Sequence, residues 1–340
     1  MLEFSFLNRR VFIKTLLISL FTKKAYLKNS LQDKITIVFG SCSNQNNSMN
    51  HWHQVVSYKP NLLILLGDNV YGDFKDKSAK ELKDAYKKLS NNKDYRYIKK
   101  NIPIIAVWDD HDYGINDGGK SWLYKNISKE IFLNFFGANK DDIRRKRQGI
   151  YKSYNINFNK KKIKIIGLDT RSFKDDFTLN KNKNINIKYI NDKNKNKTIL
   201  GESQWNWLVQ ELNDNYDLLI ILSSFQVLST SHGWEKWHNI ISERKKLLNL
   251  LDNKKNITLI LSGDRHRGGI YKLKRIYEIT ASSFNQRTFS SLEEDNIRIG
   301  GLVNQNNFGV LEIENDNIKA KLVSSNIKEE NIYKTVKLKF

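Results

Sequence analysis

Cysteine and proline are scarce in this chain of 340 residues. The single cysteine, Cys42, excludes a disulfide within the chain and therefore a small fold held together by disulfides. No apolar run approaches the roughly 20 residues of a membrane-spanning helix, which excludes a protein with several membrane spans. Hydrophobic residues nevertheless make up 39% of the chain, which is enough for a sizeable core and excludes a wholly disordered protein.

Acidic residues are few relative to basic ones. The chain has 36 Asp and Glu against 58 Lys and Arg, a formal net charge of +22. Such a charge is typical of proteins that bind nucleic acid or anionic surfaces. The lysines, however, are spread along the whole chain among Asn and Ile, which we interpret as compositional drift, so no specific nucleic-acid partner is expected. A basic nucleic-acid-binding protein without catalysis is kept as the alternative from another class.

The first 30 residues have the pattern of a targeting segment. Arg9 and Arg10 are followed by Phe12, Lys14 and the short apolar stretch 15–21, which resembles a bacterial twin-arginine export signal. We therefore expect an exported, periplasmic or secreted protein that meets the twin-arginine export machinery. No clear cleavage site follows, so an uncleaved segment that anchors the protein, with peripheral membrane contact, stays open. The alternative is a basic amphipathic helix.

Apolar patterning predicts alternating strands and helices in one large domain over 31–340. Buried strands are expected at 35–39, 61–66, 102–107, 163–168, 218–222 and 257–261, and antiparallel strands near 269–281, 308–314 and 318–324. Helices are expected at 52–58, 78–89, 121–136 and 202–212. The Lys- and Asn-rich stretch 174–199 has little periodicity and predicts a surface insertion.

Polar side chains that can bind metals or phosphate follow many of the predicted buried strands. Open α/β sheets place their sites just beyond the carboxyl ends of strands, so we expect these residues to meet. The residues at these strand ends are Cys42, Asp68, Tyr71, Asp109, Asp110, His111, Arg171, Gln226, Asp264 and His266.

Two of these strand ends suggest a metal centre. The carboxylate of Asp68 can bind two cations at once, and Tyr71, three residues later, can bind as phenolate. Phenolate together with the thiolate of Cys42 favours a higher-valent cation such as ferric iron. The simpler interpretations are a turn residue for Asp68, a half-buried aromatic for Tyr71 and a small buried side chain for Cys42.

The segment after the third strand suggests acid–base chemistry. Asp109, Asp110 and Asp112 repel one another unless cations or hydrogen bonds compensate. His111 among them suits the protonation of a leaving oxygen near neutral pH, or is simply a ring hydrogen-bonded to a neighbouring carboxylate. Arg171 can bind phosphate oxygens in a bidentate fork, or form an Asp–Arg surface pair.

Taken in order between about residues 35 and 285, the motifs resemble those of the PhoD-type alkaline phosphatases, within the calcineurin-like and purple-acid-phosphatase-like metallophosphoesterases. The motifs are Gly-Ser-Cys-Ser, Gly-Asp-Asn-Val-Tyr-Gly-Asp, Trp-Asp-Asp-His-Asp-Tyr-Gly-Ile-Asn-Asp, Leu-Asp-Thr-Arg, Gly-Glu-Ser-Gln-Trp-Asn-Trp-Leu and Ser-Gly-Asp-Arg-His. The resemblance implies an α/β fold, a four-layer α/β/β/α sandwich of two facing mixed sheets flanked by helices.

The resemblance also implies a ligand set and a cofactor of two or more metal ions, Fe³⁺ with Ca²⁺ or another divalent pair. Cys42, Asp68, Tyr71 and His266 would hold the first metal, with Asp68 bridging. Asp110 and Asp264, with Asn116, would hold the second. His111 would be the catalytic acid and Arg171 would meet the phosphate. The middle histidine ligand of other metallophosphoesterases has no clear counterpart, and Gln226 and His232 are the nearest residues.

The expected activity is metal-dependent hydrolysis of a phosphate-ester substrate, monoester or diester, by a metal-bound hydroxide. A phospholipase or a nuclease-type phosphodiesterase is the alternative within the same chemistry, because the same two-metal site can cleave either kind of ester. Only the walls of the substrate pocket decide between them. Trp234 and Trp237 are candidates for the rim of that pocket, with aromatic surface or core packing as equal alternatives.

Overall fold

The computed structural model describes residues 33–339 except 183–186, 255, 288–292 and 326–331. The predicted export signal at 1–30 lies outside the described residues. Within the described part of the chain, no helix is long and apolar enough to cross a membrane.

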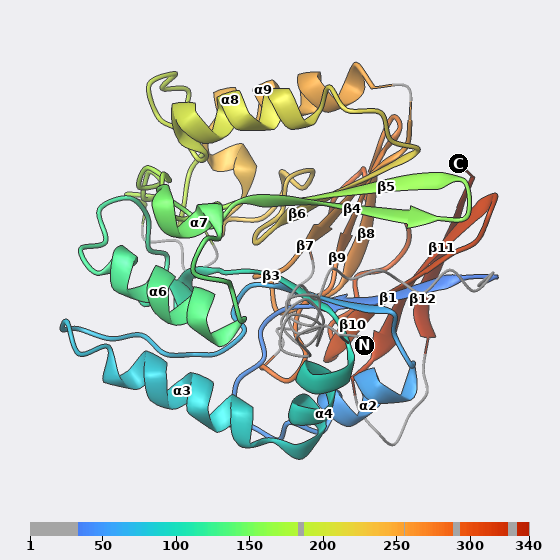
Figure 1. Ribbon diagram of the computed structural model, residues 1–340. Helices are drawn as coiled ribbons and strands as arrows, with labels where there is room; N and C mark the ends of the chain where they lie inside the picture. Colours follow the sequence, from blue (N-terminus) through green and yellow to red (C-terminus); the bar gives the residue numbers. More distant parts are fainter. Residues whose placement is uncertain (1–32, 183–186, 255, 288–292, 326–331, 340) are drawn as a thin grey trace, which may run out of the picture. The chain divides into compact units, whose positions relative to one another are not determined.

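Two six-stranded mixed sheets form the centre of the described residues (Figure 1). The first has the order β12-β11-β10-β1-β2-β3, in which β1, β2 and β3 are parallel neighbours and β10, β11 and β12 are antiparallel. Its strands are β1 (Ile35–Gly40), β2 (Leu62–Leu66), β3 (Ile104–Val107), β10 (Asn307–Ile313), β11 (Asn317–Ser324) and β12 (Ile332–Lys339). The strand β1 is buried at every residue, as an apolar strand inside a layered fold must be.

The second sheet has the order β4-β5-β6-β7-β9-β8. Here β5, β6, β7 and β9 run parallel, while β4 and β8 close the two edges as antiparallel strands. Its strands are β4 (Lys152–Phe158), β5 (Lys161–Gly167), β6 (Leu218–Ser223), β7 (Thr258–Ser262), β8 (Gly269–Leu273) and β9 (Ile276–Thr280).

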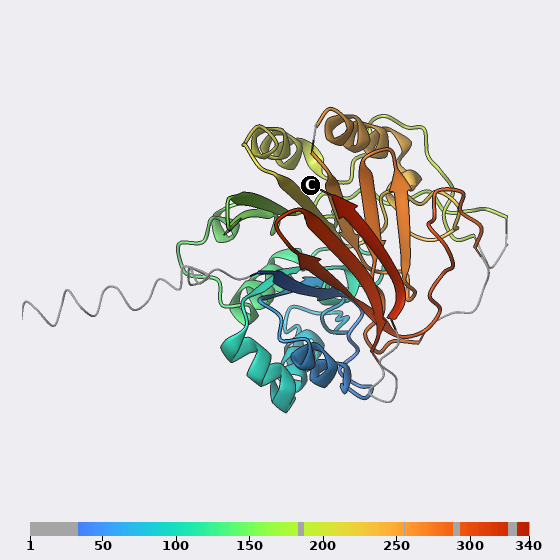
Figure 2. The same cartoon turned by 90° about the vertical axis from the view of Figure 1, so that its right-hand side faces the viewer.

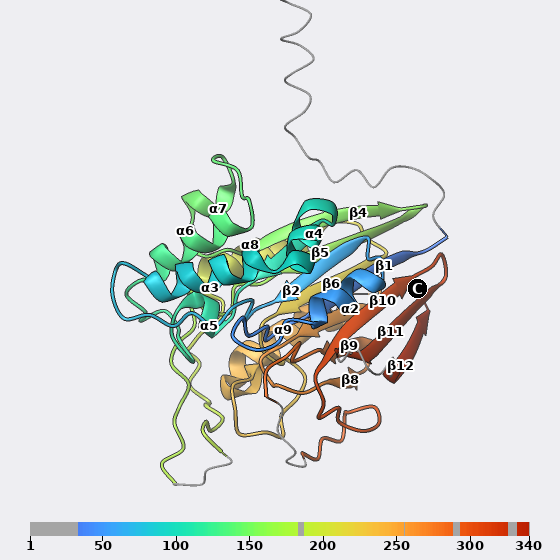
Figure 3. The same cartoon turned by 90° about the horizontal axis from the view of Figure 1, so that it is seen from below.

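Helices cover the outer faces of the two sheets, which gives the four-layer arrangement (Figure 2). On the side of the first sheet lie α2 (His51–Ser57), α3 (Lys80–Asn91), α4 (Lys93–Asn101) and α6 (Lys125–Phe135). Seen from below, α2, α3 and α4 are nearest the viewer (Figure 3). On the second sheet lie α8 (Gly201–Glu211) and α9 (Ile241–Asp252). Three shorter helical segments lie in the connections between these strands and helices. They are α5 (Asp110–Tyr113), α7 (Ile143–Lys146) and the 3₁₀ helix η1 (Trp237–Asn239).

The helices are held by apolar faces at helical spacing. In α3, Leu82, Ala85, Tyr86 and Leu89 are buried, because positions three and four apart share one face. One core cluster joins α8 and α9 to β6 and β7, so these two helices are fixed directly on the second sheet.

The described residues of 174–199, predicted as a surface insertion, are mostly exposed or half-buried, and a few side chains pack inward. Phe177 and Tyr189 are buried and belong to the core cluster under the second sheet, with their rings in edge contact at 5.5 Å. Lys174 is buried as well. Two aromatic rings separated by lysines and asparagines produce no period in the sequence, yet each finds a place against the core.

Strand register brings the predicted site residues together. Gly40 of β1 pairs with Leu65 of β2, and Leu66 of β2 pairs with Val107 of β3, so the segments after these three strands begin side by side. In the second sheet, Ser223 of β6 pairs with Ser262 of β7. The carboxyl ends of the central parallel strands therefore meet within each sheet.

Candidate metal centre

Two glycines let neighbouring loops come close, Gly263 between the two sheets and Gly67 within the first sheet. A Cβ at position 263 would lie 2.5 Å from Ser41 Oγ, and a Cβ at position 67 would lie 2.5 Å from Asp109 Cβ. Gly67 also has φ +102°, a conformation that favours glycine. A parallel bridge between Ser41 and Ser282 further joins the loop after β1 to the loop after β9. The residues after β1, β2 and β7 therefore face a common space.

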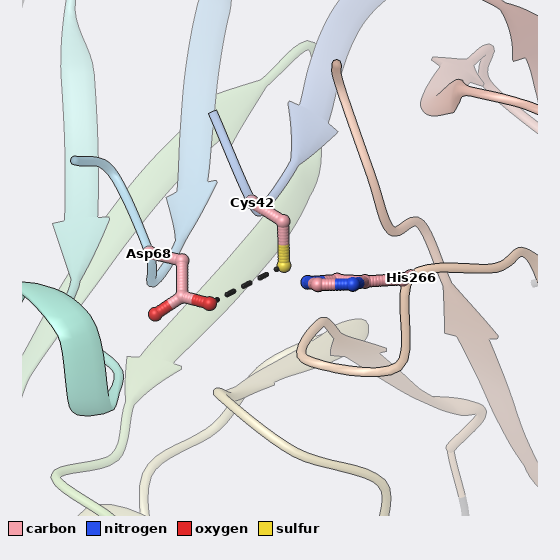
Figure 4. A group of neighbouring side chains, drawn as sticks. All are labelled: Cys42, Asp68 and His266. Carbon is pink, nitrogen blue, oxygen red and sulfur yellow. Dashed lines mark hydrogen bonds between the residues drawn. The ribbon is translucent and has the colours of Figure 1, made fainter. Parts of the chain in front are cut away.

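Cys42, Asp68 and His266 point toward one another across this space (Figure 4). The Cys42 Sγ lies 3.5 Å from Asp68 Oδ2, and the Tyr71 hydroxyl lies 3.3 Å from the same oxygen and 3.2 Å from His266 Nε2. One donor atom each from Cys42, Asp68 and His266 falls within 4.8 Å of the others. A cation placed among them would meet sulfur, oxygen and nitrogen ligands at once.

A second group shares Asp68 with the first. Asp68, Asp110 and His111 also have donor atoms within 4.8 Å of one another. The backbone N–H of His111 donates to Asp68 Oδ1 at 3.3 Å and to Asp110 Oδ1 at 3.0 Å, which holds the two carboxylates at the start of α5. Asp68 is thus the side chain that reaches both groups, as a bridging ligand must.

Four candidate ligands have a left-handed backbone. The φ values are +56° at Cys42, +47° at Asp68, +65° at Asp264 and +50° at His266. Residues with a Cβ are strained in this region, and such conformations cluster where the surrounding structure forces a side chain into a functional direction. The backbone therefore aims these side chains at some cost in conformational energy.

Electrostatics show that this space suits cations. Burial raises the pKa of the Cys42 thiol to about 12, against hydrogen bonds with Ser282 and Ser41 that lower it. Burial, and then the charges of Asp110 and Cys42, raise the pKa of Asp68 well above its usual range. A cation would lower both values, because it stabilises the thiolate and the carboxylate. The donor set thus fits a resident metal pair.

His111 is held as a hydrogen-bond donor. Its Nδ1 lies 2.6 Å from Asp73 Oδ2, and its ring lies against Tyr71 with the centroids 4.3 Å apart. Burial lowers the pKa of His111, but Asp110, Asp68 and Asp73 outweigh burial and raise that pKa to about 11. Cations bound to Asp68 and Asp110 would cancel two of these contributions and leave Asp73 as the carboxylate that keeps the imidazolium protonated.

Arg171 is placed away from the predicted phosphate contact. It is fully buried, and its Nε donates to Asp109 Oδ1 at 2.6 Å while its guanidinium pairs with Glu235 at 2.7 Å. Arg171 is not among the residues that line the cavity at the metal groups. In this structure the guanidinium of Arg171 is paired with the carboxylates of Asp109 and Glu235, and its contact with phosphate stays a prediction.

The remaining predicted ligands, Asn116 and Asp264, both line the cavity. Burial, and then the charge of Asp109, raise the pKa of Asp264 well above its usual range. Asn116 is exposed. Asp264 does not belong to the groups of three His, Cys, Asp or Glu side chains found among the described residues.

Three further residues take part that the sequence did not single out for these roles. Asp73 orients His111, and Ser282 lies 3.1 Å from Cys42 Sγ. Glu235 forms a third group with Asp110 and Asp117, within 4.8 Å. Asp73 could have been found, because it ends the same Gly-Asp-Asn-Val-Tyr-Gly-Asp motif. Glu235 and Ser282 follow no recognisable pattern.

A cavity of about 850 Å³ opens over the metal groups. It is lined by candidate metal-binding residues, among them Asp68, Asp110, His111 and His266, and also by Arg265, Arg267 and residues from 187–188, 231–235 and 293–294. Ligand pockets for drug-sized molecules have volumes of about 300–1,000 Å³, so there is room for much more than a phosphate group.

Comparison with known proteins identifies the family. A family model described as PhoD-like phosphatase matches residues 124–328. No curated protein sequence matches the chain. The match begins after Cys42, Asp68 and Asp110, so the geometry above is the evidence for those three ligands.

Solved structures share the fold. A structure of PhoD aligns over 91% of this chain and 69% of its own, with a TM-score of 0.65 and 13% identity. GAP50, the anchor in the inner membrane complex of Plasmodium, aligns over 91% of this chain and 89% of its own, with a TM-score of 0.61 and 16% identity. The purple acid phosphatase PPD1 from yellow lupin (Lupinus luteus) aligns over 90% of this chain and 54% of its own, with a TM-score of 0.61 and 11% identity.

The two facing sheets and the shared strand-end groups define a metallophosphoesterase fold. The chain belongs to the PhoD-like phosphatase family. It is a phosphoester hydrolase.

Proposed function

We propose that the protein hydrolyses phosphate esters with two cations held between its two sheets. The observation that carries this proposal is the position of Asp68, whose carboxylate lies within 4.8 Å of donor atoms of Cys42 and His266 in one group and of Asp110 in the other. One bridging carboxylate between two groups is the arrangement that holds two cations a few ångströms apart. When bound, such a pair polarises phosphoryl oxygens, lowers the pKa of water and stabilises both apical oxygens of an in-line displacement.

The donor atoms suggest different metals for the two positions. Cys42, Tyr71 and His266, with Asp68, offer thiolate, phenolate and imidazole, a set that suits ferric iron. Asp110, with Asn116 and Asp264 as further predicted ligands, offers oxygen, a set that suits calcium or another hard divalent ion. The metal-bound hydroxide expected from the sequence is part of this proposal.

His111 supplies the proton for the leaving group. With Nδ1–H donated to Asp73, the imidazolium presents its other N–H on the side chain that lines the cavity. The carboxylate of Asp73 keeps the proton on the ring until an alkoxide oxygen of the leaving group accepts it. No serine, and hence no covalent phosphoenzyme, is needed for this step.

The substrate class is proposed as a phosphate monoester or diester. The cavity volume of about 850 Å³ supports a substrate with a sizeable alcohol group. Phospholipase and nuclease-type phosphodiesterase activities use the same chemistry and are the alternatives. Export by the twin-arginine route is likewise proposed from Arg9, Arg10 and the apolar stretch after them. A reporter fused after residue 40 should be exported, and Arg9→Lys with Arg10→Lys should abolish that export.

The first experiment is elemental analysis of protein purified without added metals, with a visible spectrum and assays on p-nitrophenyl phosphate and bis-p-nitrophenyl phosphate. Iron near one atom per chain, with a charge-transfer band that is lost in Tyr71→Phe, is the expected result. Hydrolysis of one ester in preference to the other separates monoesterase from diesterase. Protein that stays colourless and inactive after reloading with iron and calcium would overturn the proposal.

A further inference from the structure

The cavity has a basic cluster that the chemistry at the metals does not use. We define it as His232, Arg265 and Arg267, which line the cavity, together with Lys236, which is not among the lining residues. Their exposed fractions are 5%, 6%, 3% and 1%, so four basic side chains are withdrawn from solvent. Burying charged groups is costly unless partners compensate. The question is therefore what compensates them.

One carboxylate serves both arginines. Arg265 and Arg267 each pair with Glu293, the second at 3.2 Å. The ammonium of Lys236 donates to the carbonyl oxygen of His232, which carries no charge. Arg265 Nε has no hydrogen-bond partner among the described residues. Glu294, which is exposed, and Asp264, which is half-buried and next to Arg265 in the chain, are further carboxyl groups that line the cavity, but neither forms an ion pair with the two arginines among the described residues. Positive charge is therefore in excess beside Glu293.

His232 adds a directed donor to this excess. Its Nδ1 accepts a hydrogen bond from the Trp234 backbone N–H at 3.2 Å. Burial, and then the charges of Arg265, Lys236 and Arg267, lower the pKa of His232 well below its usual range, so the ring is neutral. A neutral ring that accepts at Nδ1 carries its proton on Nε2. That N–H is buried without a partner among the described residues, on a side chain that lines the cavity.

The cluster and the metal groups open into one cavity. Arg265 and Arg267 flank the candidate ligand His266, and all three line the same space of about 850 Å³. Trp234, which is 41% exposed, lines it as well and offers an apolar surface. A substrate whose phosphate lies on the metals can therefore extend its alcohol group to the basic cluster.

We propose that Arg265, Arg267 and His232 form a second anion-binding subsite, so that the substrate is a phosphate ester whose alcohol carries a carboxylate or a second phosphate group. The proposal rests on the proposed phosphatase function and names its substrate class. Guanidinium groups match both anions through bidentate hydrogen bonds, and the Nε2–H of His232 supplies one more donor.

The test compares three aryl esters on the metal-loaded full-length enzyme: 4-carboxyphenyl, 4-carbamoylphenyl and 4-phosphonophenyl phosphate. The carboxyl and carbamoyl groups have similar size and differ in charge. We expect a KM about tenfold lower for the carboxyl ester, the effect of one charge-assisted hydrogen bond. The phosphono ester shows whether a carboxylate or a phosphate-like group is preferred. Equal KM values for all three esters would overturn the subsite while leaving the phosphatase function intact.

Substitutions identify which residues cause the preference for the carboxyl ester. Arg267→Gln should remove most of the carboxyl-over-carbamoyl ratio, whereas Arg96→Gln, an exposed arginine on α4, should keep it. Metal content is measured in each variant because Arg267 is next to His266. If Arg267→Gln does not fold by circular dichroism, His232→Phe takes its place and should reduce the ratio in part. A ratio unchanged in folded variants would contradict the assignment.

Binding gives a readout that does not need turnover. Calorimetry with 4-carboxybenzylphosphonate and 4-carbamoylbenzylphosphonate should show the same tenfold preference in Kd for the charged compound. Binding of both phosphonates with equal Kd would overturn the subsite alone. Absence of both turnover and phosphonate binding would overturn the proposed function, and the subsite with it.

Discussion

The acidic and basic parts of the cavity carry excess charge of opposite sign. The acidic part, Asp68, Asp110, Asp117, Glu235 and Asp264, collects carboxylates whose mutual repulsion calls for cations. The basic cluster collects guanidinium and ammonium groups around one carboxylate, Glu293. A phosphate ester with a second anionic group matches both, because its reacting phosphate goes to the cations and its other anion to the basic cluster.

The buried arginines differ in how many carboxylates compensate their charge. Arg171 is matched by Asp109 and Glu235, so its charge is compensated before any ligand arrives. Arg265 and Arg267 share one carboxylate, Glu293, and Arg265 Nε has no hydrogen-bond partner among the described residues. The number of carboxylates around a guanidinium, more than its burial, decides whether it supports the structure or can bind substrate.

Of the substitutions considered, removal of the bridging carboxylate should reduce metal binding and activity the most. Asp68→Asn keeps the size of the side chain but lacks the charge that both cations need. We expect loss of bound metal and a fall in kcat of about a thousandfold or more, since two-metal catalysis supplies several kcal/mol of transition-state stabilisation. Elemental analysis and ester hydrolysis check this. Asp316→Asn, in the exposed turn after β10, is the control; an active, metal-loaded Asp68→Asn protein would contradict the bridging role.

Removing the compensated arginine should destabilise the fold. Arg171→Met leaves Asp109 and Glu235 buried with reduced compensation, which costs about 3–5 kcal/mol of the free energy of unfolding. Urea denaturation measures the change. The exposed variant Arg96→Met should stay within about 0.5 kcal/mol of the parent. A stable Arg171→Met protein that loses only substrate affinity would restore the phosphate-binding role expected from the sequence.

The partner of His111 should have a smaller effect than the residues above. Asp73→Asn removes the carboxylate that holds Nδ1, so the imidazolium loses orientation and its pKa falls. We expect kcat to fall about 10- to 100-fold, as for other residues that orient a functional group, and more for esters with poor leaving groups. Asp76→Asn, exposed on the same loop, is the matched control. Equal slowing of activated and unactivated esters would argue against proton donation by His111.

A buried histidine behind the metal centre predicts acid sensitivity. His51 is fully buried, and burial lowers its pKa to about 3, although its Nε2 lies 3.1 Å from Ser43 Oγ. The unfolded chain takes up this proton near pH 6.5 and the folded one does not, so stability falls as pH drops below about 6.5. Between pH 7 and 5.5 the loss is about 1 kcal/mol.

His51→Phe should remove that part of the pH dependence in urea denaturation at the two pH values. His53→Phe, on the exposed face of the same helix α2, should retain it. Identical pH dependence in His51→Phe and the parent would show that His51 does not contribute to the acid sensitivity.

Much of the scaffold follows from the sequence because its strands are short apolar runs that end in polar residues. Strands near 35–39, 61–66 and 257–261 could be predicted, and so could the meeting of Cys42 with Asp68. The helix α9 and the burial of Phe177 could not, because nothing in the local period shows which sheet such residues meet.

The basic cluster was also beyond prediction. His232, Lys236, Arg265 and Arg267 come from two loops, and their excess charge is visible only once Glu293 is seen to serve both arginines. The environment of Arg171 is similar, because its carboxylates at 109 and 235 lie far from it in the chain. Partnership between distant loops is a property of the folded chain.

The left-handed backbone at Cys42, Asp68, Asp264 and His266 has a consequence for protein engineering. Glycine adopts this conformation without a Cβ penalty, so glycine at any of the four positions relieves local strain. Selection for thermostability alone would therefore favour the substitutions that delete candidate metal ligands. A library selected for a higher Tm therefore needs a parallel screen for ester hydrolysis. Without it, the variants with the highest Tm would be those that have lost candidate metal ligands and activity.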